Sequence, residues 1–188
     1  MEPGIDRRSF LRLAALSAGA LAFRPVPPIG GEEGPGLARV AATWIGLYKE
    51  PSFRSKRLAR LMRDELLSPV AQVTADEGPA HNPVWYRLPD GYAHSGNLQL
   101  VRWLPQTPVR TLPATGALFE ISVPFTRSHR EPDPASDPFY RLYYQSTHWV
   151  EKAVEGTDGH VWYQILDDVL YIHYFAPAEH LRRVRADE

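Results

Sequence analysis

The sequence predicts an all-β protein of two small β-barrels in tandem, placed after an N-terminal signal segment and a Pro/Gly-rich tether. Three observations carry this prediction. The 188 residues include 18 prolines, which oppose long helices because proline lacks a backbone N–H. They also include 5 Trp, 9 Tyr and 7 Phe, and aromatic residues favour strands. Finally, the two halves of the chain repeat the same motifs in the same order, which is typical of a duplicated unit.

Residues 1–22 have the three parts of a twin-arginine (Tat) export signal. The Arg7-Arg8 pair comes first, an uncharged apolar stretch follows over residues 13–22, and small residues close that stretch. This order predicts export by the twin-arginine route to an extracytoplasmic location, with cleavage after Ala22. The apolar stretch is about half of the roughly 20 residues that a membrane span needs, so no stable membrane span is expected.

Composition divides the rest of the chain. Residues 23–36 are rich in proline and glycine and predict a flexible tether. A second proline-rich stretch over residues 104–113 predicts a linker. The sequence therefore predicts one domain over residues 37–103 and another over residues 114–188, both at the small end of the size range of domains.

The predicted domains share an ordered set of motifs. Each has a Glu-Gly pair, a Val-Trp-Tyr triplet, an acidic turn and a Leu-x-x-Val segment. The triplets are Val84-Trp85-Tyr86 and Val161-Trp162-Tyr163. We interpret this shared order as a duplication, with about six extra residues in the second copy after its acidic turn.

Short strands are expected around these motifs. Residues 84–88 and 161–166 predict the strands that carry the triplets, because β-branched and aromatic residues dominate them. Residues 140–150 have the same composition and predict another strand. Residues 118–125 predict a strand that Pro124 interrupts or ends, since proline cannot donate a ladder hydrogen bond.

Residues 53–67 are ambiguous. Their leucines lie at helical spacing among good helix formers, and propensity alone predicts a helix. The duplication instead favours a loop, a strand over residues 58–62, a turn at Arg63-Asp64 and a strand over residues 66–73. We prefer this second interpretation, because tertiary context often overrides propensity.

Four motifs resemble those of bacterial SH3-like (SH3b) modules. They are Trp44-Ile45-Gly46-Leu47-Tyr48-Lys49-Glu50-Pro51-Ser52, Leu58-Ala59-Arg60-Leu61, Trp85-Tyr86-Arg87-Leu88 and Gly91-Tyr92-Ala93-His94-Ser95. Over residues 39–185 the chain is similar to the N-terminal non-catalytic region of exported L,D-transpeptidases (YkuD type) of filamentous green bacteria. In that family, tandem SH3-like modules precede a catalytic domain that uses a cysteine. This sequence contains no cysteine, so the resemblance implies an accessory role at the cell wall and not the activity.

No catalytic residue, metal site or cofactor is expected. The seven histidines form no short ligand pair of the kind that metal sites use, and the sequence has no G-x-S-x-G motif. Neighbouring carboxylates lie beside turn sequences, where solvated acids are common. The net charge of -1 gives no electrostatic reason to expect nucleic acid as a partner. The basic run at Arg54, Lys56 and Arg57 favours a solvated loop over a phosphate-binding patch.

The aromatic residues supply the candidate ligand-binding side chains. Alternation along a strand over residues 140–150 places Arg141, Tyr143 and Gln145 on one face. Such a face offers a flat ring edged by hydrogen-bonding groups, which suits a sugar or a peptide. The candidates are Tyr86, Tyr92, His94, Arg141, Tyr143 and Tyr163. The competing interpretation is that most of these rings fill the cores of small barrels and that His94 closes a turn.

The expected function is that of an exported, non-catalytic module that binds peptidoglycan or another cell-wall polymer. Two alternatives remain open. The chain is the N-terminal accessory part of an L,D-transpeptidase whose catalytic Cys domain is absent from it, or it is a protein-docking module for a cell-wall enzyme.

Overall fold

The computed structural model describes residues 36–75, 81–185 and 187–188. The predicted export signal, with Arg7, Arg8 and the cleavage position at Ala22, lies outside the described residues, as does nearly all of the predicted tether. The described residues form strands and two short 3-10 helices, with no α-helix among them. The predicted all-β class is therefore confirmed.

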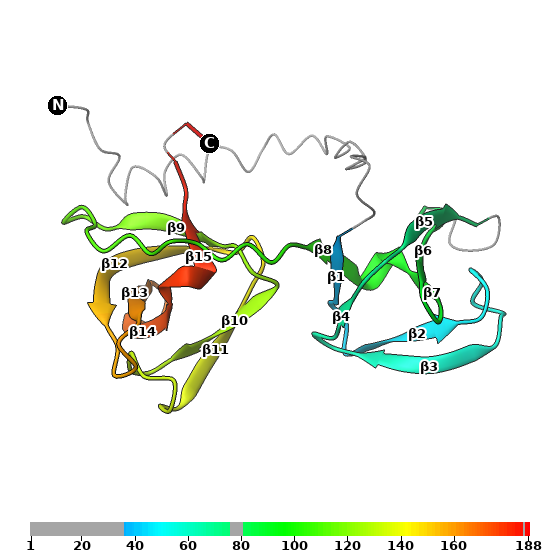
Figure 1. The fold of residues 1–188 in the computed structure, drawn as a ribbon, viewed down its shortest axis with the longest axis horizontal. Helices are drawn as coiled ribbons and strands as arrows, with labels where there is room; N and C mark the ends of the chain where they lie inside the picture. The colour runs from blue at the N-terminus through cyan, green and yellow to red at the C-terminus, as the bar shows by residue number, and fades with distance from the viewer. Residues whose placement is uncertain (1–35, 76–80, 186) are drawn as a thin grey trace.

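The strands divide between two lobes that lie side by side (Figure 1). The first lobe has a three-stranded sheet in the order β4-β1-β8 and a five-stranded sheet in the order β3-β2-β7-β6-β5. Its elements are β1 (Leu37–Val40), β2 (Trp44–Tyr48), β3 (Arg57–Met62), β4 (Leu66–Leu67), β5 (Ala71–Thr74), β6 (Val84–Leu88), β7 (Gly91–His94), η1 (Ser95–Asn97) and β8 (Leu98–Val101).

The second lobe is one seven-stranded antiparallel sheet in the order β11-β10-β14-β13-β12-β9-β15. Its elements are β9 (Ala117–Ile121), β10 (Phe125–His129), β11 (Pro138–Tyr143), β12 (Thr147–Glu155), β13 (Val161–Asp167), β14 (Ile172–Pro177), η2 (Ala178–His180) and β15 (Leu181–Arg183). All three strand orders in the described part of the chain are open-ended, so closure into two barrels stays a prediction.

Each lobe has its own hydrophobic core. Leu47, Leu61 and Leu88 belong to the cluster of the first lobe, whereas Phe119 and Ile165 belong to a separate cluster in the second. The strands supply these residues by alternation: β9, with sequence ALFEI, buries every second residue, as expected for a sheet with one face on a core. Two separate clusters mean that each lobe buries its own apolar surface.

The backbone hydrogen bonds of the first lobe recur in the second with residue numbers 81 higher. The Asp64 N–H donates to the Val40 carbonyl at 2.9 Å, and the Gln145 N–H donates to the Ile121 carbonyl at 2.9 Å. Asp64 and Gln145 also share a left-handed conformation, with φ of 67° and 64°. Matched bonds at matched spacing show that the repeated motifs of the sequence build the same local structure twice.

The correspondence extends to the loops. The Lys49 N–H donates to the Lys56 carbonyl, and the counterpart bond joins Arg130 to Asp137. These bonds close the β2–β3 loop and the β10–β11 loop in the same way. After the triplets the numbering offset changes, because the connection between β13 and β14 is longer than the turn between β6 and β7. Counterpart residues can therefore be compared one by one between the lobes.

The structure decides between the two interpretations of residues 53–67. It has a loop, then β3, a turn at Arg63-Asp64 and β4, so the strand interpretation is confirmed. The single strand expected over residues 66–73 is wrong, since β4 and β5 are separate strands. Pro69 lies between them and has no N–H to donate to a ladder.

The single strand expected over residues 140–150 is also wrong. β11 ends at Tyr143 and β12 begins at Thr147. Gln145 lies between them with a φ of 64°, a left-handed conformation that no strand residue adopts. Consequently Arg141 and Tyr143 lie on one strand, as expected, but Gln145 belongs to the turn. The strand expected over residues 118–125 ends before Pro124, in agreement with the reading of that proline.

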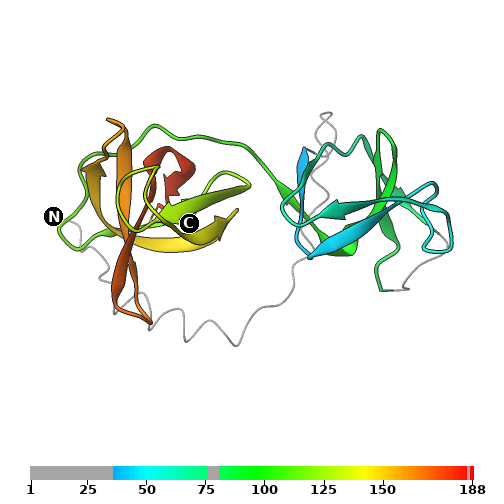
Figure 2. The same cartoon turned by 90° about the horizontal axis from the view of Figure 1, so that it is seen from below.

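The segment between β8 and β9 is attached to the second lobe. Figure 2 shows it passing from one lobe to the other along the second. Three of its backbone N–H groups donate to that lobe: Leu104 to the Ser122 carbonyl at 3.1 Å, Gln106 to the Glu179 carbonyl at 2.7 Å, and Val109 to the Tyr163 hydroxyl at 2.8 Å. The segment therefore forms part of the surface of the second lobe.

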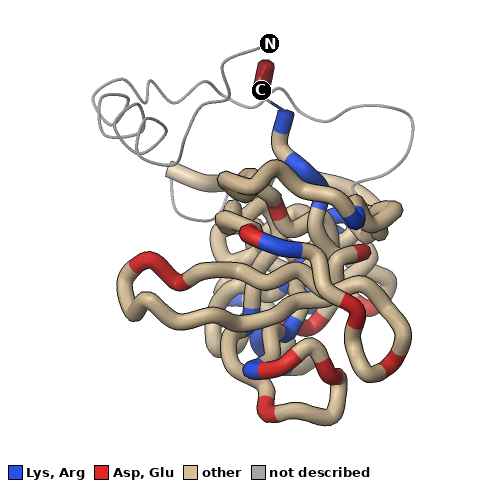
Figure 3. The backbone as a smooth tube through the Cα atoms, turned by 90° about the vertical axis from the view of Figure 1, so that its left-hand side faces the viewer, with Lys and Arg blue, Asp and Glu red and all other residues tan. Residues whose placement is uncertain are grey.

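Charges of both signs are interspersed along the second lobe, and several loops carry acidic residues (Figure 3).

Among the described residues, no helix has the length and apolar character needed to cross a membrane.

Candidate ligand-binding site

Two of the expected binding residues are buried. Tyr86 is 7% exposed and Tyr163 is 1% exposed, so the expectation that their rings are exposed is wrong. Each occupies the middle of its Val-Trp-Tyr strand, and burial raises the pKa of both hydroxyls above the ordinary value. The Tyr163 hydroxyl accepts the hydrogen bond from Val109. Both rings contribute to the packing of the lobes.

His94 closes the turn at η1, as the competing interpretation predicts. Its Nδ1 accepts from the Gly96 N–H at 3.2 Å, and its Nε2 lies 2.9 Å from the Asn82 carbonyl. Because an N–H only donates, Nδ1 carries no proton, and Nε2–H donates to the carbonyl. Tyr92 is half-buried on β7, where it pairs with Tyr48 on β2.

Arg141 and Tyr143 lie at the junction between the lobes. Arg141 forms an ion pair with Asp64 of the first lobe. The Arg39 guanidinium of the first lobe lies 4.2 Å from the centre of the Tyr143 ring, within the range of a cation–π contact. The Gln99 side chain donates to the Tyr144 carbonyl at 3.2 Å. The structure thus places this pair of candidates against the other lobe.

An aromatic cluster fills the surface between the β2–β3 loop and β6 in the first lobe. The Phe53 ring lies 4.8 Å from the Trp85 ring and 5.0 Å from the His94 ring. The Tyr48 ring packs edge-on against Trp85 at 5.7 Å. It also lies over Gly46, where a Cβ would come 2.7 Å from Tyr48 Cζ. Trp85 is fully buried under these rings, and its Nε1 has no hydrogen-bond partner among the described residues.

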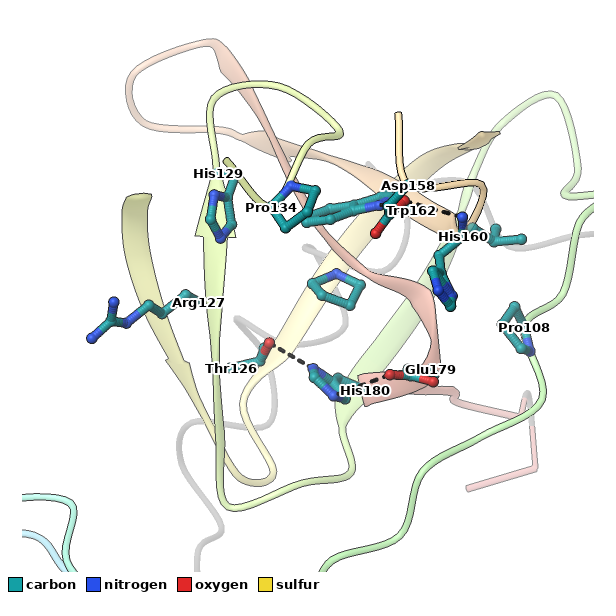
Figure 4. A pocket seen from close by; sticks show the side chains of 12 residues that line it. Pro108, Thr126, Arg127, His129, Pro134, Asp158, His160, Trp162, Glu179 and His180 are labelled. Carbon is teal, nitrogen blue, oxygen red and sulfur yellow. Dashed lines mark hydrogen bonds and ion pairs between the residues drawn. The ribbon is translucent and has the colours of Figure 1, made fainter. Parts of the chain in front are cut away.

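The corresponding surface of the second lobe is a cavity of about 380 Å³ (Figure 4). It lies beside the β10–β11 loop, and the segment before β9 closes one side of it. The residues that line it are Pro108, Thr126, Arg127, His129, Pro134, Asp158, His160, Val161, Trp162, Pro177, Glu179 and His180. A volume of this size lies within the range of small-molecule sites.

Smaller side chains leave this cavity open. The counterparts of Tyr48, Phe53 and His94 are His129, Pro134 and Pro177, as the strand registers and loop bonds align them. Trp162 takes the place of Trp85, and among the rings of the described residues it packs against that of His129, edge-on at 5.5 Å. Trp162 is itself 2% exposed, so the smaller side chains leave the cavity beside a covered indole, at a place that the Tyr48 and Phe53 rings fill in the first lobe.

One end of the cavity is organised by Asp158. Its Oδ1 accepts from Trp162 Nε1 at 3.1 Å and from the His160 N–H at 3.0 Å. Desolvation acts to raise the pKa of Asp158, but these two hydrogen bonds and the nearby His160 outweigh it and hold the pKa below its ordinary value. The carboxylate is therefore charged at neutral pH and fixes the indole against the floor of the cavity.

The other end carries a hydroxyl, an imidazole and a carboxylate. Thr126 Oγ1 lies 2.8 Å from His180 Nδ1, and His180 Nε2 lies 3.6 Å from Glu179 Oε1. Burial lowers the pKa of His180, and Glu179 offsets only part of this effect. Although a hydroxyl next to a neutral imidazole is the geometry of an activated nucleophile, Thr126 is 4% exposed and the carboxylate is beyond hydrogen-bond range. The hydroxyl, the imidazole and the carboxylate therefore supply polar atoms at this end of the cavity.

The cavity residues were not found by sequence reasoning, although a signal existed. Short spacing between histidines is the sequence signal for a metal site, and His129, His160 and His180 lack it. A residue-by-residue comparison of the two copies shows the replacement of Tyr48 and Phe53 by smaller residues. That comparison requires counterpart residues to be numbered 81 apart, and it is the strand pairing in the structure that establishes this offset. No group of three or more histidine or acidic side chains suited to a metal occurs in the described ranges.

Comparison with known proteins gives structural neighbours but no family. No protein-family model matches the chain, and no curated protein matches it. Among solved structures, one described as the endolysin LysPBC5 CBD overlaps 83% of this chain and 98% of its own, with 11% sequence identity and a TM-score of 0.29.

Proposed function

We propose that this protein is an exported, non-catalytic module that binds peptidoglycan through the cavity of its second lobe. The observation that carries the proposal is the open cavity beside Trp162, at a place where the duplicated first lobe is filled by its own aromatic rings. The resemblance to SH3-like modules of L,D-transpeptidases and the twin-arginine motif support a location at the cell wall. The absence of cysteine from the sequence supports an accessory role.

The lining matches a ligand that has both polar and apolar groups. Pro134 and Pro177 offer apolar surface, and Asp158 and Glu179 offer acceptors for hydroxyl or amide groups. Peptidoglycan stems contain amides and a terminal carboxylate, and its sugars contain hydroxyl groups. A few convergent polar groups around an apolar surface are the usual composition of such sites.

The test is co-sedimentation of the protein with purified peptidoglycan sacculi. In the variant Pro134→Phe, the ring that stands at the counterpart position Phe53 is introduced into the cavity. We expect it to reduce binding by at least about tenfold, because it removes the space beside Trp162. The matched control is Pro113→Phe, which places the same ring at an exposed proline outside the cavity lining and is expected to bind like the parent.

Glu179→Gln tests the charge contribution, since Glu179 is exposed and lines the cavity. We expect binding to fall by about threefold to tenfold if the Glu179 carboxylate accepts a hydrogen bond from the ligand. Failure of the parent protein to sediment with sacculi would refute the proposal. Equal binding by Pro134→Phe and the parent would refute the assignment to this cavity.

A further inference from the structure

The contact that joins the two lobes uses one face and one edge. The docking face of the second lobe consists of Phe125, Arg141 and Tyr143 on β10 and β11. The docking edge of the first lobe consists of Arg39 on β1, Asp64 in the β3–β4 turn and Gln99 on β8. Arg141 pairs with Asp64, and Arg39 stacks on Tyr143. Because the lobes are duplicates, each lobe contains both a face and an edge, and this contact uses one of each.

The docking face of the first lobe is unoccupied in the described structure. Its residues are Trp44, Arg60 and Met62, numbered 81 lower than Phe125, Arg141 and Tyr143, and the β2–β3 register confirms the match. Trp44 is 40% exposed and Met62 is 54% exposed. Large apolar side chains gathered on one exposed strand pair are typical of an interaction surface.

Arg60 is already held as Arg141 is held. The Arg60 guanidinium lies 4.6 Å from the centre of the Trp44 ring, and that of Arg141 lies 5.3 Å from the centre of the Phe125 ring. Arg141 then reaches a carboxylate of the other lobe, whereas Arg60 has no ion pair with any residue in the described ranges. Both faces present the same cation on the same kind of ring, and only one of them is used within the chain.

The docking edge of the second lobe is likewise not part of the contact that joins the two lobes. Its residues are Glu120, Gln145 and Arg182, the counterparts of Arg39, Asp64 and Gln99, with Glu120 opposite Arg182 as Arg39 is opposite Gln99. Gln145 is exposed and has the backbone conformation of Asp64. In this edge Glu120 replaces Arg39 and is paired with Arg182, which also pairs with Glu188. Two carboxylates for one guanidinium suit a face that carries the two arginines Arg57 and Arg60 around Trp44.

We propose that the docking face of the first lobe binds the docking edge of the second lobe of a second copy of this chain. Copies then associate head to tail, with the geometry that already joins the lobes within one chain. In the new contact Arg60 meets Gln145 Oε1, and Glu120, still paired with Arg182, lies next to Arg57 and Arg60. Such a heterologous contact repeats along a line of molecules and closes only if its rotation does.

The test is sedimentation velocity of the full chain over rising protein concentration. The variant Gln145→Asp gives the second edge the carboxylate that Asp64 gives the first, at a backbone conformation that Asp64 shows to be acceptable. We expect it to tighten self-association by about twofold to fivefold, the effect of one partly exposed ion pair. Arg60→Glu is expected to weaken self-association and to cancel the gain from Gln145→Asp. Arg87→Glu, which changes an exposed arginine on β6, is the matched control and is expected to behave like the parent.

Cross-linking identifies the occupant of the face. The chain has no cysteine, so single variants Arg60→Cys and Gln145→Cys can be mixed and treated with a short bismaleimide. We expect a cross-linked dimer from this mixture and little from Arg60→Cys mixed with Lys152→Cys. A chain that stays monomeric at all concentrations with Gln145→Asp would overturn the proposal, as would a cross-linked dimer that forms from Arg60→Cys with Lys152→Cys as readily as from Arg60→Cys with Gln145→Cys.

Discussion

Asp64 is the acceptor through which the two lobes share one charge network, and Asp64→Asn tests its contribution to stability. The Arg39 Nη1 donates to its Oδ1 at 2.7 Å, and Arg141 pairs with its Oδ2. Asparagine tolerates the left-handed conformation that Asp64 adopts. The substitution therefore removes the charge and one acceptor without adding backbone strain.

The magnitude follows from the two contacts. A charge-assisted hydrogen bond contributes about 1.5–3 kcal/mol and a neutral one about 0.5–1.5 kcal/mol, so weakening the Arg39 contact costs about 1 kcal/mol. The amide nitrogen of asparagine faces Arg141 as a donor, so that contact is lost, at a further cost of about 1 kcal/mol because the Arg141 side chain is 36% exposed. The sum is about 2 kcal/mol. It stays below the cost of breaking an isolated buried pair, since Gln99 Oε1 still accepts from Arg39 Nη2 at 2.7 Å.

The assay is urea unfolding of the parent, of Asp64→Asn and of Arg141→Gln, followed by fluorescence and circular dichroism. Arg141→Gln removes the ion pair with Asp64 and the stacking of Arg141 on Phe125, leaves the Arg39–Asp64 contact in place, and is expected to cost about 1 kcal/mol or less. A free energy of unfolding for Asp64→Asn within about 0.5 kcal/mol of the parent would refute the reasoning, because it would mean that solvent replaces the network without loss.

Two further predictions concern the second lobe. Gly156→Ala places a Cβ against the Trp162 indole and 2.6 Å from a backbone oxygen. We expect this crowding to lower the free energy of unfolding, measured in urea, by about 1–3 kcal/mol. We also expect it to shift the fluorescence emission spectrum of Trp162. Burial lowers the pKa of His148 and of His180 below 6.5. As the pH drops below about 6.5, the unfolded chain therefore takes up protons that the folded chain does not. The free energy of unfolding then falls by up to about 1.4 kcal/mol per pH unit for each histidine. Urea unfolding between about pH 7 and pH 5 should show this slope, and His148→Asn should reduce it; an unchanged slope would contradict the assignment to His148.

The strand composition of the chain was accessible from the sequence, and the duplication was the decisive signal. Residues 57–62 carry helix-forming side chains at helical spacing, yet they form β3. The matching segment of the second copy, residues 138–143, is aromatic and β-forming, so comparison of the copies overrides the propensity of either one.

The location of the candidate site was not accessible in the same way. A tyrosine next to a tryptophan on a strand predicts that one ring faces inward and the other outward, but both Trp85 and Tyr86 are buried, and so are Trp162 and Tyr163. Each of these strands is covered on both faces, by its own core and by a loop. The covering loops lie far from the strands in sequence, and alternation carries no information about them.

The Tyr143 ring shows a second limit. Its strand face was predicted correctly, but the residues opposite that face come from the other lobe. Sequence patterns describe the periodicity of one strand, and the contact depends on how two folded units are oriented.

The attachment of the segment between β8 and β9 has a mechanical consequence. Because Leu104, Gln106 and Val109 are bonded to the second lobe and Pro108 lines the cavity, a force that pulls the lobes apart acts on the wall of the cavity once the direct contacts between the lobes have parted. The hydrogen bonds of this segment then break one after another, starting with that of Leu104, before the force reaches the hydrogen bonds of the sheet. Occupancy of the cavity and separation of the lobes are then linked through a strip of six residues, and a bound ligand would resist the detachment of this segment.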